Sequence, residues 1–155
     1  MCSSDLAADR WAQIIVGDIP DVVVDGIAVD DIVIDASAPT IDGVSGILGQ
    51  AGPTAFRNGS MLPSRGIMEF DQADLADLQS SGDLLNVIVH EMGHVIGIGT
   101  IWDSLGLVQN VGTEIHFTGS RAVAEYNSIF GTSGNFVPVE TDGGSGTAEI
   151  GRAHV

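Results

Sequence analysis

The segment His90–His94 reads His-Glu-Met-Gly-His and lies in an apolar stretch long enough for a helix. Because side chains four residues apart share one face of an α-helix, we expect His90 and His94 to point the same way. Two neutral imidazoles placed like this can bind one zinc ion, and Glu91 beside them can take a proton from a water that the zinc activates. The motif predicts a zinc hydrolase, most often a peptidase.

The third zinc ligand does not follow from this motif. A catalytic zinc usually has three protein ligands and one water. In the compact metzincin pattern H-E-x-x-H-x-x-G-x-x-H the third histidine falls at position 100, where this chain has Thr100, although Gly97 fits the pattern. Two explanations stay open: the third ligand lies farther along the chain, or the site is degenerate. We consider His154 as a substitute ligand and expect His116 to be structural or exposed.

The helix that carries the motif is expected to be central and buried. Asp83 is a suitable N-cap, and Gly97 and Gly99 are expected to end the helix. Apolar residues surround the motif on nearly all sides of this helix, which is typical of a buried helix. Buried polar groups require partners, and a metal ion supplies one for three residues together.

The remaining elements are short. We expect helices and strands to be mixed along the chain, with Asp71 as the N-cap of the helix at 73–79. By analogy with zinc peptidases, we expect residues 66–70 to line the substrate cleft. Apart from the motif helix, the expected helices are 7–15, 73–79 and 120–130, the expected strands are 22–24, 32–34 and 66–70, and the expected loops are 43–66 and 131–146.

Composition limits the classes of partner. The chain has 155 residues with a formal net charge of −16 and no lysine, so its surface repels nucleic acid phosphates and anionic membranes. It suits a soluble protein, including one that works in salt, where self-repulsion is screened. No stretch approaches the roughly 18 to 20 apolar residues of a membrane span. A calcium site among the aspartates of the first half is an alternative, but no D-x-[DN]-x-[DN]-G loop is present.

Both ends of the chain are expected to be foreign to the natural protein. Codons for residues 1–6 and 150–155 can be written so that the core of one string is the reverse complement of the other, and both resemble a common short-read sequencing adapter. We therefore expect a single, partial domain over residues 7–149, with adapter-derived tails on either side. Cys2, the only cysteine, and His154 then fall in these tails.

Five segments resemble the leishmanolysin-like zinc metallopeptidases, and the resemblance covers nearly all of residues 7–148. It implies that His90 and His94 bind Zn²⁺ and that Glu91 is the catalytic base. In that family a long insertion separates the glycine of the motif from the third histidine, which follows a GGxGT sequence. Here IGRAHV follows instead, which implies that the third ligand and the methionine turn are missing. The segments are 29–57, 62–75, 90–102, 120–127 and 137–148.

The sequence therefore predicts an α+β fold, a metzincin-like zincin catalytic domain with a small mixed sheet packed on a central zinc-binding helix. The expected activity is that of a secreted or cell-surface zinc metalloendopeptidase acting on protein or peptide, slow or inactive without its third ligand. The main alternative is a non-catalytic zinc-binding or adhesive module of a large extracellular protein, against which the intact Glu91 argues. A non-peptidase zinc hydrolase is a further alternative, against which the turn at Gly97 argues.

Overall fold

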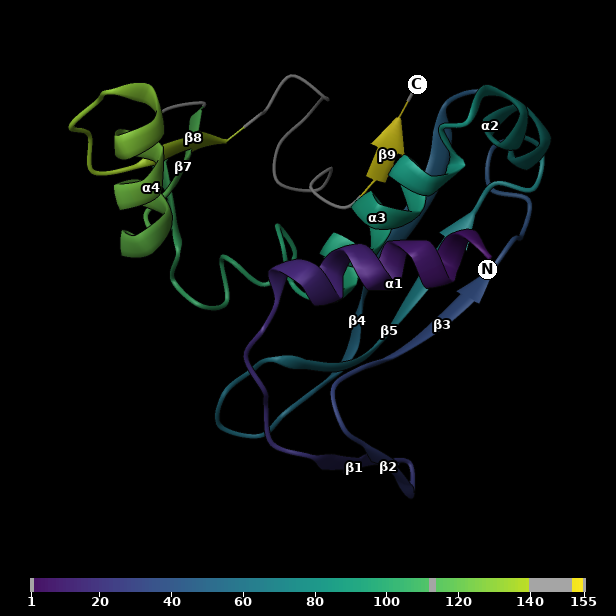
Figure 1. Ribbon diagram of the computed structural model, residues 1–155, viewed down its shortest axis with the longest axis horizontal. Coiled ribbons are helices and arrows are strands. Elements are labelled where there is room, and N and C mark those ends of the chain that lie inside the picture. Colours follow the sequence, from purple (N-terminus) through teal and green to yellow (C-terminus); the bar gives the residue numbers. More distant parts are fainter. Residues whose placement is uncertain (1, 112–113, 140–151, 155) are drawn as a thin grey trace. The chain divides into compact units, whose positions relative to one another are not determined.

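The chain has a mixed α+β architecture, seen here in a computed structural model that describes residues 2–111, 114–139 and 152–154. Figure 1 shows the elements in their order along the chain. They are α1 (Ser3–Ile14), β1 (Val22–Val24), β2 (Ile27–Val29), β3 (Val33–Ser37), β4 (Ile47–Phe56), β5 (Pro63–Phe70), α2 (Leu75–Ser81), α3 (Leu84–Val95), β6 (Val108–Val111), β7 (Glu114–Phe117), α4 (Ser120–Phe130), β8 (Val137–Val139) and β9 (Arg152–His154).

The chain forms two compact units. The first comprises Met1–Thr100 together with Ile150–Val155, and the second comprises Ile101–Glu149. In the second unit, β6, β7 and β8 form an antiparallel sheet in that order, and α4 follows β7 in the chain. The candidate zinc motif belongs to the first unit.

The main sheet of the first unit is mixed, with the strand order β3-β5-β4-β9. β3 runs parallel to β5, whereas β4 runs antiparallel to both β5 and β9. β5 therefore has a hydrogen-bonded neighbour on each side. Since an inner strand has no free backbone groups, an extended peptide could not pair with β5, which limits the expected role of residues 66–70 in lining a cleft to their side chains.

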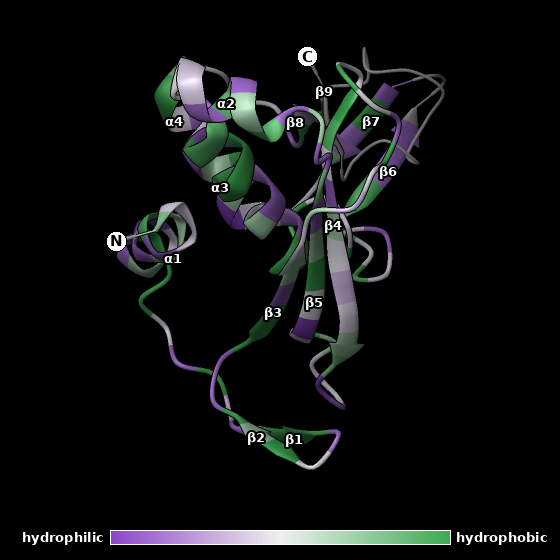
Figure 2. Cartoon of the chain, turned by 90° about the vertical axis from the view of Figure 1, so that its right-hand side faces the viewer, coloured by the Kyte–Doolittle hydropathy of each residue, from purple (hydrophilic) through white to green (hydrophobic). Residues whose placement is uncertain are grey.

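Helix α3 covers one face of this sheet, as Figure 2 shows, and the core lies between them. On the other side of α3 lies α1, whose Trp11 Nε1 donates a hydrogen bond to the carbonyl of Val89 at 3.0 Å. A Cβ on Gly93 would lie 3.2 Å from Trp11 Cζ2, so this glycine allows the indole to pack closely on α3. The buried core comprises Ala7, Leu48, Met68, Phe70, Leu78, Val87, Ile88, Met92 and Val95.

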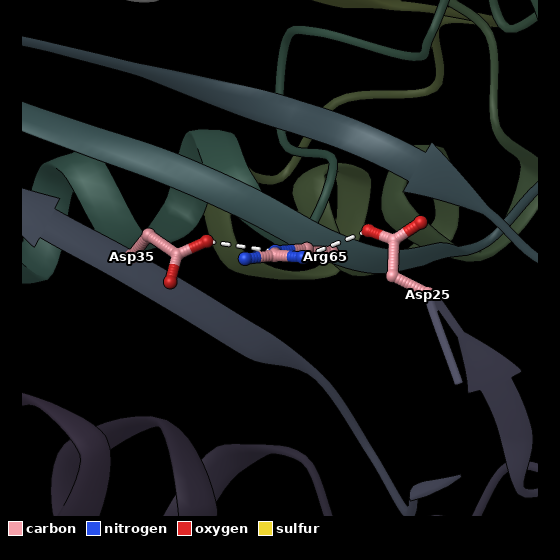
Figure 3. Close-up of polar contacts among 3 residues, drawn as sticks. All are labelled: Asp25, Asp35 and Arg65. Atoms are coloured by element: carbon pink, nitrogen blue, oxygen red, sulfur yellow. Dashed lines mark hydrogen bonds and ion pairs between the residues drawn. The ribbon is translucent and has the colours of Figure 1, made fainter. Parts of the chain in front are cut away.

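A β-hairpin, β1–β2, projects away from the main sheet (Figure 1). Asp25 and Gly26 form its turn with φ of 52° and 81°, the left-handed conformation that Asp-Gly turns favour. Figure 3 shows how Arg65 of β5 lies between two carboxylates: its Nε donates to Asp35 at 2.7 Å and its Nη1 to Asp25 at 3.0 Å. Arg65 thus connects β5 with β3 and with the turn of the hairpin.

Several expected elements are confirmed with small shifts. α4 has the expected bounds, β1 coincides with 22–24, and strands are found at 33–37 and 63–70. The first helix begins at Ser3 and ends at Ile14, which extends it into the expected adapter-derived tail. The helix after β5 starts at Leu75, with Asp74 rather than Asp71 at its N-cap.

The expected loop at 43–66 is wrong. Residues 47–56 form β4, the longest strand of the sheet, although they include Gly49, Gly52 and Pro53. These residues have low strand propensity, but β4 is paired on both sides and its ladder is irregular between Pro53 and Phe56. The expected loop at 131–146 is also interrupted, by β8. In both cases tertiary pairing outweighs local propensity.

Candidate metal centre

Helix α3 presents the motif close to its C-terminal end. Asp83 occupies the N-cap position as expected, although its side chain makes no capping hydrogen bond. The helix ends at Val95, and Gly97 and Gly99 follow with φ of 111° and 81°, a conformation open mainly to glycine. Thr100 Oγ1 donates to the carbonyl of His94 at 2.7 Å. The turn that follows the helix therefore fixes the backbone at His94.

The two histidines of the motif meet on one face of the helix, as their spacing predicts. His94 Nε2 lies 2.9 Å from His90 Nε2, and the rings are nearly perpendicular, with centroids 4.5 Å apart. His94 is 6% exposed, whereas His90 is exposed at the surface. The two nitrogens therefore face each other at the edge of the core, within reach of solvent through His90.

The hydrogen bond of His94 to the backbone fixes which of its nitrogens can bind a metal. His94 Nδ1 lies 2.8 Å from the carbonyl oxygen of Ile98. Because a carbonyl only accepts, Nδ1 carries the proton, and in the neutral ring the lone pair is then on Nε2, facing His90. A metal-binding histidine usually donates its other N–H in this manner.

The distance between the two nitrogens fits a shared ion. Zinc–nitrogen bonds of about 2.0–2.1 Å at a tetrahedral angle place two ligand nitrogens roughly 3.3 Å apart. The observed 2.9 Å corresponds to a hydrogen bond from His90 Nε2 to His94 Nε2. To share an ion, His90 must carry its proton on Nδ1 instead, and the pair must open slightly to reach the zinc spacing. His90 and His94 are therefore a suitable pair of zinc ligands.

Both rings are biased toward the neutral form that metal binding needs. Partial desolvation of its ring by the surrounding protein lowers the pKa of His90 below its ordinary value, although the residue is exposed, and the adjacent His94 lowers this pKa further. Burial also lowers the pKa of His94, and the bond to the Ile98 carbonyl partly offsets this effect. Neither ring therefore has to lose a positive charge before it binds a metal at neutral pH.

Glu91 lies inside the protein, against the main sheet. Its relative exposure is 0%. A Cβ built on Gly49 of β4 would lie 3.1 Å from Glu91 Cγ and 3.2 Å from Oε1, so a larger residue here would force the glutamate side chain to shift by a few tenths of an ångström. β9 pairs with β4 at the same place, with Ala153 opposite Gly49. The glutamate of the motif therefore lies close to the backbone of β4, near the point where β9 joins the sheet.

The structure does not bring a third ligand side chain to this pair within its described part. Residues 143–148, where the resemblance places the approach to the third ligand, lie outside the described residues. The backbone of His154 belongs to β9, opposite Ile47, but its side chain is also outside that part, so its role as a ligand stays a prediction. His116 belongs to the second unit, where it is buried, stacks on Phe136 with centroids 3.6 Å apart and contacts Glu114. That is the structural role expected for it.

The sequence suggested a calcium site among the aspartates of the first half as an alternative, but not which of them come together. In the described part of the chain, the group of three potential ligands whose ligand atoms all lie within 4.8 Å of one another is Asp18, Asp30 and Asp31, all exposed. Asp18 is separated from the other two by the β1–β2 hairpin. The Asp-Gly turn at residues 25–26 was the available signal, because a hairpin there brings the residues on its two flanks together.

Comparison with known proteins adds no assignment. No protein-family model matches the chain, and no curated protein matches it. Among the described residues, no helix is long and apolar enough to cross a membrane.

Proposed function

We propose that this chain is a catalytic domain of the metzincin type, that His90 and His94 bind Zn²⁺, and that the domain hydrolyses peptide bonds. The observation that carries the proposal is the 2.9 Å approach of the two Nε2 atoms, together with the bond from His94 Nδ1 to the Ile98 carbonyl. The mixed sheet under α3 is compatible with the α+β class of such a domain. Protein or peptide is the proposed substrate, and a secreted or cell-surface location accompanies the proposal.

The residues of the chain divide the work as follows. His90 and His94 hold the ion with their Nε2 atoms, and the Ile98 carbonyl and the Thr100 hydroxyl keep His94 oriented. When bound, Zn²⁺ supplies Lewis-acid chemistry, because it lowers the pKa of a water and polarises a substrate carbonyl. The carboxylate of Glu91 takes the proton of the attacking water and passes a proton to the leaving amine. Its full burial strengthens the electrostatic effect of this carboxylate.

The test compares this chain with a second, longer protein. In the longer protein, residues 149–155 are replaced by the sequence that follows Ala148 in the natural gene, because the present C-terminal tail is expected to be adapter-derived. We expect the longer protein to bind one zinc per chain by metal analysis and to cleave casein. The variant Glu91→Gln should keep the zinc and lose about 10²- to 10⁴-fold in rate. His90→Gln should lose both zinc and activity.

Two outcomes would decide against this proposal. Full activity in Glu91→Gln would exclude the glutamate as the base. If the longer protein binds zinc stoichiometrically but cleaves no protein substrate, the chain is better described as a non-catalytic zinc-binding or adhesive module.

A further inference from the structure

A cavity of about 620 Å³ lies in the first unit, between α1 and the residues after it, the start of β3 and β5, and one face of α3. This volume lies within the range of small-molecule sites. Met92 of α3 and Ile96, the residue directly after this helix, line the cavity, whereas His90, Glu91 and His94 do not. The cavity is therefore distinct from the candidate metal centre.

The wall is almost entirely apolar. The indole of Trp11 contributes a flat face, and its Nε1 proton is already donated to the Val89 carbonyl, so the ring offers no hydrogen bond to a ligand. Ile15, Ile32 and Ile34 add aliphatic surface. The one charged residue of the lining is Asp31. Such a wall favours an apolar body with few polar groups.

The charge at Asp31 is reinforced by its neighbours. Asp18 and Asp30 place carboxylate oxygens within 4.8 Å of one another and of Asp31. The pKa of Asp30 is raised, chiefly by the negative charge of Asp31 and then by that of Asp21, which shows that the carboxylates repel one another. A cation beside them would relieve this repulsion.

The protein supplies little positive charge to neutralise the cluster. The chain has no lysine, and the guanidinium of the buried Arg57 donates to the main-chain carbonyls of Asp30 and Asp31 rather than to their carboxylates. Arg57 also binds the carbonyl of Pro20 at 2.9 Å. This arginine therefore holds the two segments that carry the acidic residues in place, and leaves their carboxylates facing solvent.

We propose that this cavity binds a small organic cation with an apolar body, such as an alkylammonium or arylalkylammonium ion. The apolar body fills the space between Trp11 and Met92, and the cationic head lies beside Asp31. This assignment rests on the cavity and on charge complementarity alone, so it is independent of the zinc chemistry proposed above.

The test measures the binding of hexyltrimethylammonium by calorimetry and compares it with heptanoate, an anion of similar length, and with 1-hexanol. We expect saturable one-to-one binding of the cation, at least tenfold tighter than that of either comparison compound. Trp11 emission provides a second readout in the background Trp102→Phe, which removes the other tryptophan. All variants are checked for folding by circular dichroism.

Two substitutions separate this site from general attraction to an acidic protein. Asp31→Asn should weaken cation binding at least fivefold, whereas Asp77→Asn, which removes an exposed charge on α2, should leave it unchanged. Ala12→Leu, which narrows the cavity, should weaken the cation and the alcohol alike. Equal effects of the two aspartate variants, equal affinity for cation and anion, or binding that does not saturate would each overturn the proposal.

Discussion

At the scale of single residues, small contacts decide whether the motif can work. Glu91 is fully buried and packs closely against Gly49, the residue of β4 that faces it. The orientation of His94 depends on one backbone carbonyl and one hydroxyl that come after the helix, from Ile98 and Thr100. The motif identifies the candidate zinc ligands and the candidate base. The residues that contact them, which lie outside the motif, determine where their atoms lie.

Gly49→Ala tests the placement of Glu91, on the premise of the proposed peptidase activity. The added methyl would lie 3.1 Å from Glu91 Cγ and must displace it. A shift of a few tenths of an ångström is enough to relieve this contact. Because displacements of about 1 Å cost on the order of 10²-fold in rate, we expect this smaller shift to lower kcat severalfold while KM and zinc content change little. Steady-state kinetics of the zinc-loaded longer protein described under Proposed function measure this, and Gly52→Ala, on the same strand with open space around it, is the control. Equal activity in the two variants would contradict the role of Gly49.

Protonation of Asp71 should lower the stability of the protein in acid. Its Oδ2 accepts bonds from the backbone N–H groups of residues 41, 42 and 43, and its Oδ1 from that of Ala73. The backbone N–H groups of Ala73 and of the 41–43 loop lower the pKa of Asp71 from 3.8 to about 2. Because the folded pKa lies below the unfolded one, the stabilisation is complete above about pH 4 and is lost as the pH falls toward 2.

Asp71→Asn should therefore be less stable than the parent at pH 6, and the difference should shrink as the pH approaches 2. Urea unfolding between pH 6 and 2 measures it. The exposed Asp77→Asn serves as the matched control and should follow the parent at every pH. A difference between Asp71→Asn and the parent that stays constant over this range would show that the carboxylate charge is not the cause.

At the scale of elements, the distance between α3 and the sheet is set by glycine in β5. A Cβ on Gly66 would lie 2.4 Å from Val95 Cγ1 and 2.7 Å from the carbonyl oxygen of Gly52, closer than atoms can approach. Met68 and Phe70, which follow on the same face of β5, fill the core beneath the helix. On this face of β5, Gly66 therefore lets α3 approach closely, and the large side chains of Met68 and Phe70 fill the space beside it.

Gly66→Ala should destabilise the protein by about 1–3 kcal/mol, the usual cost of an overpacked core. The matched control Gly52→Ala adds the same methyl group to the neighbouring strand in open space and should change stability much less. Denaturant unfolding at neutral pH compares the two. If both substitutions cost the same, the loss reflects strand glycines in general and the close packing of α3 is not responsible.

At the scale of the whole molecule, charge is the dominant feature. The chain has 21 acidic residues and only five basic ones. In the described part of the chain, Arg65 is the arginine that forms ion pairs with carboxylates. The resulting self-repulsion opposes the compact state. Salt should relieve it, because the Debye length shortens from about 30 Å at 0.01 M to about 10 Å at 0.1 M.

We therefore expect the thermal midpoint to rise by several degrees when NaCl is increased from about 0.01 M to about 0.1 M. Potassium chloride should have the same effect, since screening depends on ionic strength and not on the identity of the cation. Differential scanning calorimetry at pH 7 provides the measurement. A midpoint that falls with salt, or that rises only with one particular cation, would argue for specific ion pairs or specific ion binding.

By itself, the sequence determined the elements whose pattern is local. The spacing of His90 and His94, the glycines after α3 and the amphipathic run of α4 depend on residues within a few positions of one another, and all lie where expected. An Asp-Gly turn of the same local kind also specified the β1–β2 hairpin, although the expected strands did not include β2.

Only the tertiary structure decided the rest. The strand at 47–56 contains glycine and proline and becomes a strand because β5 and β9 pair with it. The burial of Glu91 against Gly49 and the use of Asp71 by the loop at 41–43 join residues about 30 to 40 positions apart. Such contacts depend on how the strands pair and which face of the sheet α3 covers, and local sequence patterns carry little information about either.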